Sequence, residues 1–151
     1  MSVETGIVED LKSKFTDAIT DASVQRQARI ILTAKSEAVI NVASYLKENL
    51  GFDFVVSVCG AEMPQEDLFT IIYHFWSSSK KILITLKTKV PKKAPKIQSI
   101  TPVYESANWH ERETHEMWGV KFIKHPDLGG LLLPEGWKDL PPQRKEFKLT
   151  G

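Results

Sequence analysis

The chain has 151 residues, of which 42% are hydrophobic and 26% are charged, and its formal net charge at pH 7 is +1. A chain of this length and composition is expected to fold as one soluble globular domain with its own hydrophobic core. The small net charge argues against a general nucleic-acid-binding protein, because such a protein needs a basic face to displace the counterions around the phosphates.

Hydropathy and cysteine content limit the class of protein further. No apolar run reaches the roughly 20 residues that a membrane-spanning helix needs, and the acidic residues Glu4, Glu9 and Asp10 are not typical of a signal peptide. The only cysteine, Cys59, excludes an internal disulfide and an all-cysteine iron–sulfur or zinc site within this chain. We therefore expect an intracellular protein in which Cys59 is a small buried apolar residue.

The N-terminal part of the chain predicts a short helix followed by two strands. The helix covers residues 3–15, where apolar residues recur every four positions and so share one face. Two short strands are expected over residues 18–20 and 28–33. The polar residues between them, 21–27, predict a turn.

The clearest helix in the sequence covers residues 36–50. Its apolar residues follow the i, i+3, i+4, i+7 spacing of an amphipathic helix, with Ser36 as a possible cap and Gly51 as a stop. The following run, residues 54–59, is short and rich in β-branched residues, which predicts a buried strand.

A β-hairpin is predicted next. Residues 68–76 are dense in aromatic and β-branched side chains, three serines form the turn, and residues 82–86 alternate between apolar and polar. The prolines and lysines of residues 90–96 predict an extended, solvated linker. Residues 1–100 therefore predict an α+β body: an antiparallel or mixed sheet with a few helices on one face.

The remaining residues, 101–151, form a distinct C-terminal part of the same single domain. A helix is expected from Glu105 to Trp118 with Gly119 as its stop, and a short strand over residues 120–123. Arg112 and Glu116 are an i, i+4 pair on this helix. Beyond the strand, frequent proline and glycine exclude long regular elements.

The end of the chain predicts an extended arm. Two adjacent prolines in the run Leu140–Gln143 exclude a helix, because they remove backbone donors and push the preceding residues towards extended geometry. Such an arm would present the run Arg144–Phe147 either to acidic residues of the preceding helix or to a partner. A buried arginine at an interface contributes far more than an exposed ion pair within the chain, which favours the partner.

A metal-dependent hydrolase is one alternative, built on His110, Glu111 and His115. Zinc hydrolases of this type place two histidines four positions apart on a helix, so that both imidazoles reach one ion. Here the spacing is five, which turns the two side chains roughly 140° apart. A free-standing binding module is a second alternative. Large aromatics beside paired charges, as in Trp109 with the run Glu111–Glu113, are typical of interface anchors.

The C-terminal third also resembles a known family. Five runs carry the resemblance in order and spacing: residues 107–113 (ANWHERE), 117–122 (MWGVKF), 125–128 (HPDL), 133–137 (LPEGW) and 144–147 (RKEF). Together they are similar to the signature of the C subunit of NADH–quinone oxidoreductase, respiratory complex I. Related subunits serve membrane-bound nickel–iron hydrogenases and archaeal dehydrogenases that use a reduced deazaflavin coenzyme.

The resemblance implies a subunit of the peripheral arm that has no cofactor and no activity of its own. Its expected partners are the large quinone-site or hydrogenase-like subunit and the iron–sulfur subunits, on the cytoplasmic side of the membrane, with membrane contact only through partners. The residues expected at the partner interface are Trp109, Glu111, Arg112, Glu113, Trp118, His125, Asp127, Arg144, Lys145, Glu146 and Phe147.

Some positions depart from the family pattern. Gly129-Gly130 stands where basic residues are common, Pro141 and Gln143 replace a common His and Leu, and Glu146-Phe147 replaces Asp-Tyr. These departures favour an archaeal or otherwise divergent complex over the bacterial and mitochondrial NADH branch.

Overall fold

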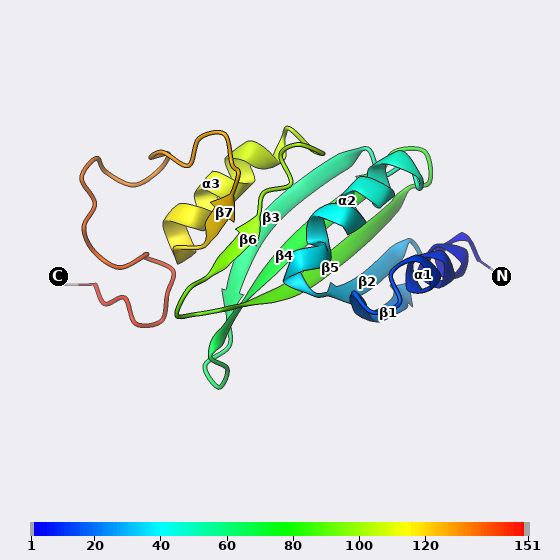
Figure 1. Ribbon diagram of the computed structural model, residues 1–151, viewed down its shortest axis with the longest axis horizontal. Coiled ribbons are helices and arrows are strands. Elements are labelled where there is room, and N and C mark those ends of the chain that lie inside the picture. The colour runs from blue at the N-terminus through cyan, green and yellow to red at the C-terminus, as the bar shows by residue number, and fades with distance from the viewer. Residues whose placement is uncertain (1, 150–151) are drawn as a thin grey trace.

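The computed structural model describes residues 2–149 of the chain, and its centre is a five-stranded mixed sheet (Figure 1). Neighbouring strands run antiparallel except β2 and β5, which are parallel. The strands, in spatial order, are β1 (Ile19–Arg26), β2 (Arg29–Ala34), β5 (Ile82–Pro91), β4 (Leu68–Ser77) and β3 (Phe54–Glu62). With three helices beside this sheet, the α+β class with a mixed sheet is confirmed.

Two helices, α1 (Val3–Lys14) and α2 (Val39–Glu48), lie in front of the sheet in Figure 1. The amphipathic pattern of α2 places Val39, Val42, Ala43 and Leu46 in the core. A single turn of 3-10 helix, η1 (Ser36–Ala38), leads into α2 where the sequence predicted the first turn of one continuous helix. The apolar faces of these helices and one face of the sheet together form the core.

Strand β4 shows how the alternation of side chains orients the sheet. Phe69, Ile71, Tyr73 and Phe75 are buried, while the residues between them are partly exposed. Because successive side chains point to opposite faces, one face of the sheet is the core face and the other is not covered to the same extent.

The third helix, α3 (Ala107–Trp118), lies along the edge strand β3. The hydroxyl of Thr114 donates to the carbonyl of Val58 at 3.0 Å, so the helix occupies a backbone acceptor on this edge. Two three-residue strands, β6 (Lys96–Gln98) and β7 (Lys121–Ile123), pair in parallel on either side of α3 in the sequence. Ile97 and Phe122, the middle residues of these strands, are buried in the common core.

Several boundaries differ from the prediction. Strand β1 continues to Arg26, so most of residues 21–27 belong to an edge strand instead of a turn. They are exposed apart from Ala22, which is buried, and the chain reverses only at Gln27 and Ala28, the latter with φ 63°. The linker over residues 90–96 is also shorter than predicted, because Val90 belongs to β5 and is buried, while Lys96 begins β6. Cys59 is exposed, since it lies on the edge strand β3.

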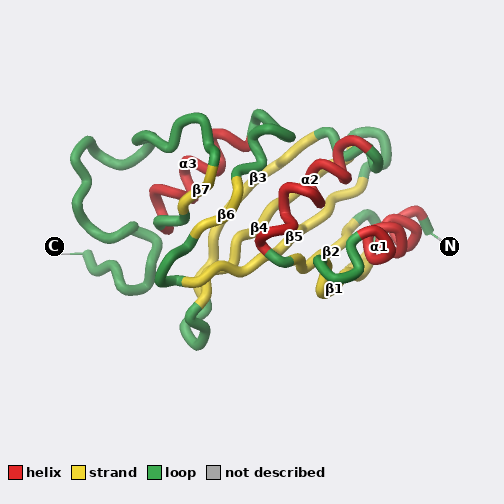
Figure 2. Tube along the Cα trace, viewed as in Figure 1, coloured by secondary structure: helices red, strands yellow, loops and turns green. Residues whose placement is uncertain are grey.

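The segment after β7 contains no helix or strand among residues 124–149 and forms one continuous loop (Figure 2). The predicted extended arm is not confirmed. The amide of Arg144 donates to the carbonyl of Pro141 at 3.2 Å, and that of Phe147 donates to Arg144 at 3.1 Å. Pro141 and Pro142 exclude a helix, but they permit these tight turns. Within residues 2–149, no helix has the length and apolarity that crossing a bilayer requires.

The packing of α3 on β3 can be tested at Gly60. A Cβ atom at this position would lie 2.6 Å from Cδ1 of Trp118, whose ring packs edge-on against Phe69. We expect Gly60→Ala to lower the free energy of unfolding by about 1–3 kcal/mol through overpacking. Thermal and urea denaturation measure the change. Gly6→Ala is the control: nothing lies within 4 Å of its added Cβ, and this helical position should gain up to about 1 kcal/mol. An unchanged melting temperature for Gly60→Ala would contradict the described contact.

Candidate functional site

Helix α3 and the loop that follows it form the candidate site, and the helix is fixed at both ends. Gly119 ends it in the left-handed conformation with φ 76°, and its amide donates to the carbonyl of His115 at 2.8 Å. This is the glycine stop that the sequence predicted. Ala107 at the start and Thr114 near the middle are buried against the body of the domain.

Glu111 is completely buried. One carboxylate oxygen accepts from the amide of Ile100 at 2.8 Å and from the hydroxyl of Ser99 at 3.1 Å. The other oxygen has no hydrogen-bond partner, and neither does the buried hydroxyl of Tyr73. Burial raises the pKa of Glu111 to about 7, although its two hydrogen bonds oppose the shift. Burial, followed by the charge of Glu111, also raises the pKa of Tyr73.

This placement corrects the interface expected from the sequence, because Glu111 does not reach the surface. Its carboxylate instead joins α3 to the segment before it, at Ile100. A polar side chain on a helix can be buried in a hydrogen bond within the fold or exposed for a partner. The spacing of residues along the helix did not determine which applies to Glu111.

Glu116, one helical turn beyond Arg112, holds the loop after β7. Its carboxylate accepts three consecutive amides, from Leu131 at 2.6 Å, Leu132 at 2.7 Å and Leu133 at 3.4 Å. Burial alone would raise the pKa of Glu116, but these hydrogen bonds and the charge of Arg112 outweigh it and lower the pKa. The carboxylate therefore stays ionised and fixes the loop to the helix.

Arg112 holds the same loop from the other side. Its guanidinium donates to the carbonyls of Gly129, at 3.3 and 3.4 Å, and Gly130, at 2.9 Å, and lies 5.0 Å from the ring centroid of Trp109. Both members of the predicted i, i+4 pair, Arg112 and Glu116, therefore bind the same loop.

Arg144 joins the end of the chain to α3. Its Nε donates to the carbonyl of Trp118 at 2.7 Å, and its guanidinium lies 5.0 Å from the ring centroid of Phe69. It also forms an ion pair with Glu146 at 3.2 Å. Of the two alternatives, the return of this charge to Glu111, Glu113 or Glu116 does not occur: the arginine donates to a carbonyl at the C-terminal end of α3, where the helix dipole favours a cation. Contact with a partner, the alternative that the sequence favoured, stays a prediction.

Two backbone contacts next to Arg144 strengthen this attachment. The amide of Gln143 donates to the carbonyl of Met117 at 3.0 Å. The amide of Lys145 donates to the carboxylate of Glu62 at 2.8 Å. Phe147 lies beside Trp137, with 6.0 Å between ring centroids.

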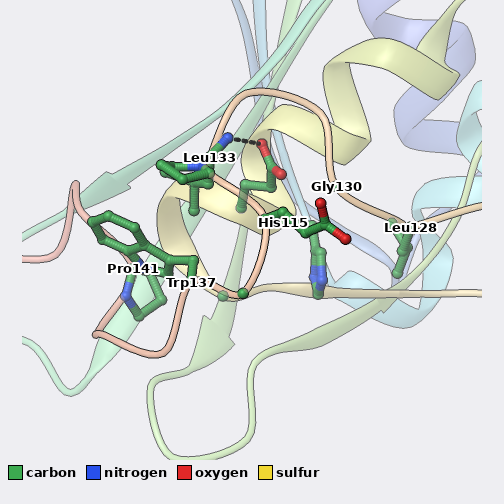
Figure 3. Close-up of a pocket in the computed structure, with 11 residues that line it drawn as sticks. His115, Leu128, Gly130, Leu133, Trp137 and Pro141 are labelled. Atoms are coloured by element: carbon green, nitrogen blue, oxygen red, sulfur yellow. Dashed lines mark hydrogen bonds between the residues drawn. The ribbon is translucent and has the colours of Figure 1, made fainter.

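A cavity of about 470 Å³ separates α3 from the loop (Figure 3). Its wall includes His115 and Glu116 from the helix and, from the loop, Glu135 and several apolar residues, among them Leu128, Leu133 and Trp137. The dashed line in Figure 3 marks the contact between Leu133 and Glu116.

Large apolar side chains of this region face solvent. Trp109 on α3 is 60% exposed, and Leu132, Trp137 and Leu140 on the loop are 59%, 39% and 42% exposed. The three loop residues were absent from the predicted interface. Two signals in the sequence bear on them: Leu132 lies in an apolar run, Leu131–Leu133, between glycine and proline, where regular structure that would bury it is excluded, and Trp137 lies in the signature run 133–137.

The other residues of the predicted interface take several positions. Glu113, Asp127, Lys145 and Glu146 are exposed, while Trp118 and Phe147 are half-buried. His125 is also half-buried: its Nδ1 accepts from the amide of Asp127 at 2.9 Å and its Nε2 lies 3.1 Å from the carbonyl of Asn108. These two contacts fit a neutral imidazole protonated on Nε2.

The residues of the hydrolase alternative do not converge. Glu111 points into the core, and Nδ1 of His115 lies 2.8 Å from the carbonyl of Val120. Over residues 2–149, no three His, Cys, Asp or Glu side chains are grouped so that they could hold a metal ion. The five-residue spacing already predicted that His110 and His115 would face apart.

Comparison with known families gives a match over most of the chain. Residues 32–151 match the model of the respiratory-chain NADH dehydrogenase 30 Kd subunit. The chain is 37% identical to the C subunit of F420H2 dehydrogenase from Methanosarcina mazei, over 94% of this chain and 90% of that protein. It is 36% identical to the C subunit of NADH-quinone oxidoreductase from Sinorhizobium medicae, over 89% of this chain and 67% of that protein.

Two solved structures share the fold at 20% sequence identity. One is a chain in the structure of the membrane-bound sulfane sulfur reductase, described as an archaeal respiratory membrane complex, with a TM-score of 0.81 over 96% of this chain and 85% of that chain. The other is a trypsin-resistant fragment of Nqo5, with a TM-score of 0.68 over 82% of this chain and 97% of that fragment.

The burial of Glu111 predicts that stability depends on pH. The pKa of Glu111 is about 7 in the folded protein, whereas its ordinary value, which applies to the unfolded chain, is 4.5. Between these two pH values the folded state therefore binds more protons than the unfolded state. Stability from this group is fully present below pH 4.5 and is lost as pH rises through about 7, by on the order of 3 kcal/mol. We expect Glu111→Gln to remove this dependence. The free energy of unfolding of the variant, measured by urea denaturation and compared with that of the parent chain, should therefore rise from pH 5 to pH 8.

The control for this variant is Glu113→Gln, which removes an exposed carboxylate two positions away. For this control, the free energy of unfolding should change with pH as it does in the parent chain over the same range. If that of Glu111→Gln also changes as in the parent chain, Glu111 is not an uncompensated buried carboxyl group.

The contacts of Arg144 predict a local effect on the C-terminal segment. Arg144→Ala removes a charged hydrogen bond of about 1.5–3 kcal/mol, so the amides of residues 137–147 should exchange with deuterium about tenfold faster or more. The core strands should be unaffected. Lys145→Ala is the matched control, because Lys145 contributes its backbone amide to Glu62 and its side chain is exposed. Equal exchange in both variants would show that the guanidinium does not hold the segment.

Proposed function

Because this chain belongs to the family of the respiratory-chain NADH dehydrogenase 30 Kd subunit, we propose that it is a cofactor-free, peripheral-arm subunit of a membrane-bound, ion-translocating oxidoreductase. Its role would be to position the large quinone-site or hydrogenase-like subunit and the iron–sulfur subunits during electron transfer. The names of its relatives support this proposal, since they are the C subunits of an F420H2 dehydrogenase and of NADH-quinone oxidoreductases.

The observation that carries the proposal is a set of exposed apolar side chains on α3 and on the loop that α3 holds in place. Trp109, Leu132, Trp137 and Leu140, defined here as the docking surface, are each at least 39% exposed. A loop with ionic attachments to a helix loses little additional entropy when it binds, because much of its backbone is already ordered. Large aromatic residues on such a surface are the usual anchors of protein interfaces.

The ionisable residues of the signature support a structural role over a catalytic one. Glu111 holds the amide of Ile100, Glu116 holds three loop amides, and Arg144 holds the carbonyl of Trp118. Each of these groups is thus engaged in fixing backbone, which is the work expected of a docking subunit. In this proposal the chain has no activity alone and reaches the cytoplasmic side of the membrane only through its partners.

Replacing Trp109 tests the docking surface. We expect Trp109→Ala to weaken co-purification of the large subunit by roughly 2 kcal/mol or more, about thirtyfold in affinity, since anchors of this type dominate interfaces. The stability of the isolated chain should change by only about 0.5–1 kcal/mol, the value of its contact with Arg112. Affinity is measured by titrating the tagged chain against the purified large subunit.

The control is Val24→Ala, which removes an exposed apolar side chain on the other edge of the sheet, in β1. It should bind as the parent chain does. Full binding by Trp109→Ala would refute the docking surface. A chain that migrates alone in native purification from membranes would instead favour the free-standing binding module.

A further inference from the structure

The face of the sheet opposite the helices is open. The register of the strands places five side chains in a row across it, one from each strand: Phe54, Trp76, Leu83, Arg29 and Arg26. The next row holds Ser57, His74, Thr85, Ile31 and Ser23. Every residue of these two rows is at least partly exposed, whereas the residues that alternate with them in β4 and β5 are buried. We call this surface the open sheet face.

One corner of the open sheet face is apolar. Phe54 is 56% exposed, and it pairs in register with Trp76, which in turn pairs with Leu83. Val56, the extra residue where the register of β3 shifts, is exposed beside this corner. Neither Trp76 nor Leu83 belongs to the core cluster or packs against it. An aromatic and aliphatic corner of this kind, on a flat sheet, favours a protein partner over a small ligand.

The centre of the open sheet face is positive. Arg29 and Lys87 flank His74, and among residues 2–149 neither cation forms an ion pair. Burial first, and then the charges of Arg29 and Lys87, lower the pKa of His74, while its Nδ1 lies 2.8 Å from the hydroxyl of Ser57. Lys87 belongs to the row after Thr85, which also holds Asp21 on β1, two strands away from it. In the described part of the chain, Asp21 forms no ion pair with Lys87 or Arg29. Arg26 adds a further positive charge to the face, so an acidic partner complements it.

From this geometry we propose that the open sheet face is a second docking surface, which binds an acidic segment of another subunit of the same complex. Apolar side chains of that segment would cover Trp76 and Leu83, and its carboxylates would pair with Arg29 and Lys87. The inference rests on the proposed function, since the partner is a further subunit. A second copy of this chain fits poorly: a twofold interface would bring the cations of one copy towards those of the other.

Photo-crosslinking in the intact complex tests this proposal. A benzophenone amino acid replaces Thr85, at the centre of the open sheet face, in the tagged full-length chain purified with its complex from membranes. A second version carries the same group at Trp109. We expect Thr85 to crosslink to an Asp- and Glu-rich peptide of another chain. Crosslinking only to a second copy of this chain, or only at position 109, overturns the proposal.

Charge reversal supplies the matched comparison. Arg29→Glu with Lys87→Glu should lower the crosslink yield at position 85 about tenfold or more, and the milder pair Arg29→Gln with Lys87→Gln should lower it less. Lys12→Glu with Lys35→Glu makes the same change in net charge at two exposed lysines outside the face and should leave the yield unchanged. Equal yields for all pairs overturn the proposal. Melting temperatures confirm that each variant is folded.

Two further outcomes keep the inference separate from the proposed function. Binding of the chain to vesicles of phosphatidylcholine and phosphatidylserine, abolished by the Arg29 and Lys87 reversals, would assign the face to a membrane surface and overturn the proposal. If the chain migrates alone on a native gel and crosslinks at neither position, the proposed function itself fails. Crosslinking at position 109 without position 85 rejects only the second surface.

Discussion

The carboxylate of Glu116 is the interaction on which the C-terminal third depends. Residues 124–149 have no helix or strand to satisfy their backbone groups, so side chains have to do so. Glu116 binds three consecutive amides, Arg112 binds two carbonyls from the same loop, and Arg144 binds the carbonyl of Trp118. Without these charges the loop would lose its attachment to α3, and the apolar residues it carries would lose their fixed positions.

Charged residues in this chain therefore divide into those that hold the fold and those that remain available. Glu111 and Glu116 lie only five positions apart on α3, yet burial raises the pKa of the first, and hydrogen bonds from the loop lower that of the second despite its burial. Glu111 is the more deeply buried of the two and accepts from one amide and one hydroxyl, whereas Glu116 accepts from three amides and also lies near the charge of Arg112. Arg29 and Lys87 on the open sheet face form no ion pair within the described residues. Their charges therefore remain available to a binding partner.

The two proposed surfaces lie on different parts of the molecule. The docking surface is built from α3 and the loop after β7, which cover the edge at β3, whereas the open sheet face spans all five strands on the side opposite the helices. A protein with two such surfaces can hold two neighbours at once, which suits a positioning role. The preference for an archaeal or otherwise divergent complex, drawn from departures such as Gly129-Gly130, stays a prediction.

The sequence alone determined the features that local pattern encodes: helix α2, the hairpin of β4 and β5, the stop of α3 at Gly119, and the family, through a motif that is linear in the chain. Tertiary structure decided the rest. The parallel pairing of β2 with β5, the strand β6 and its pairing with the predicted strand β7, and the full length of β1 depend on neighbours distant in sequence. The burial of Glu111 against Ile100 and the turns at Pro141 also required the fold. Periodicity reports which face of an element is apolar, but only the packed chain determines which polar group meets which partner.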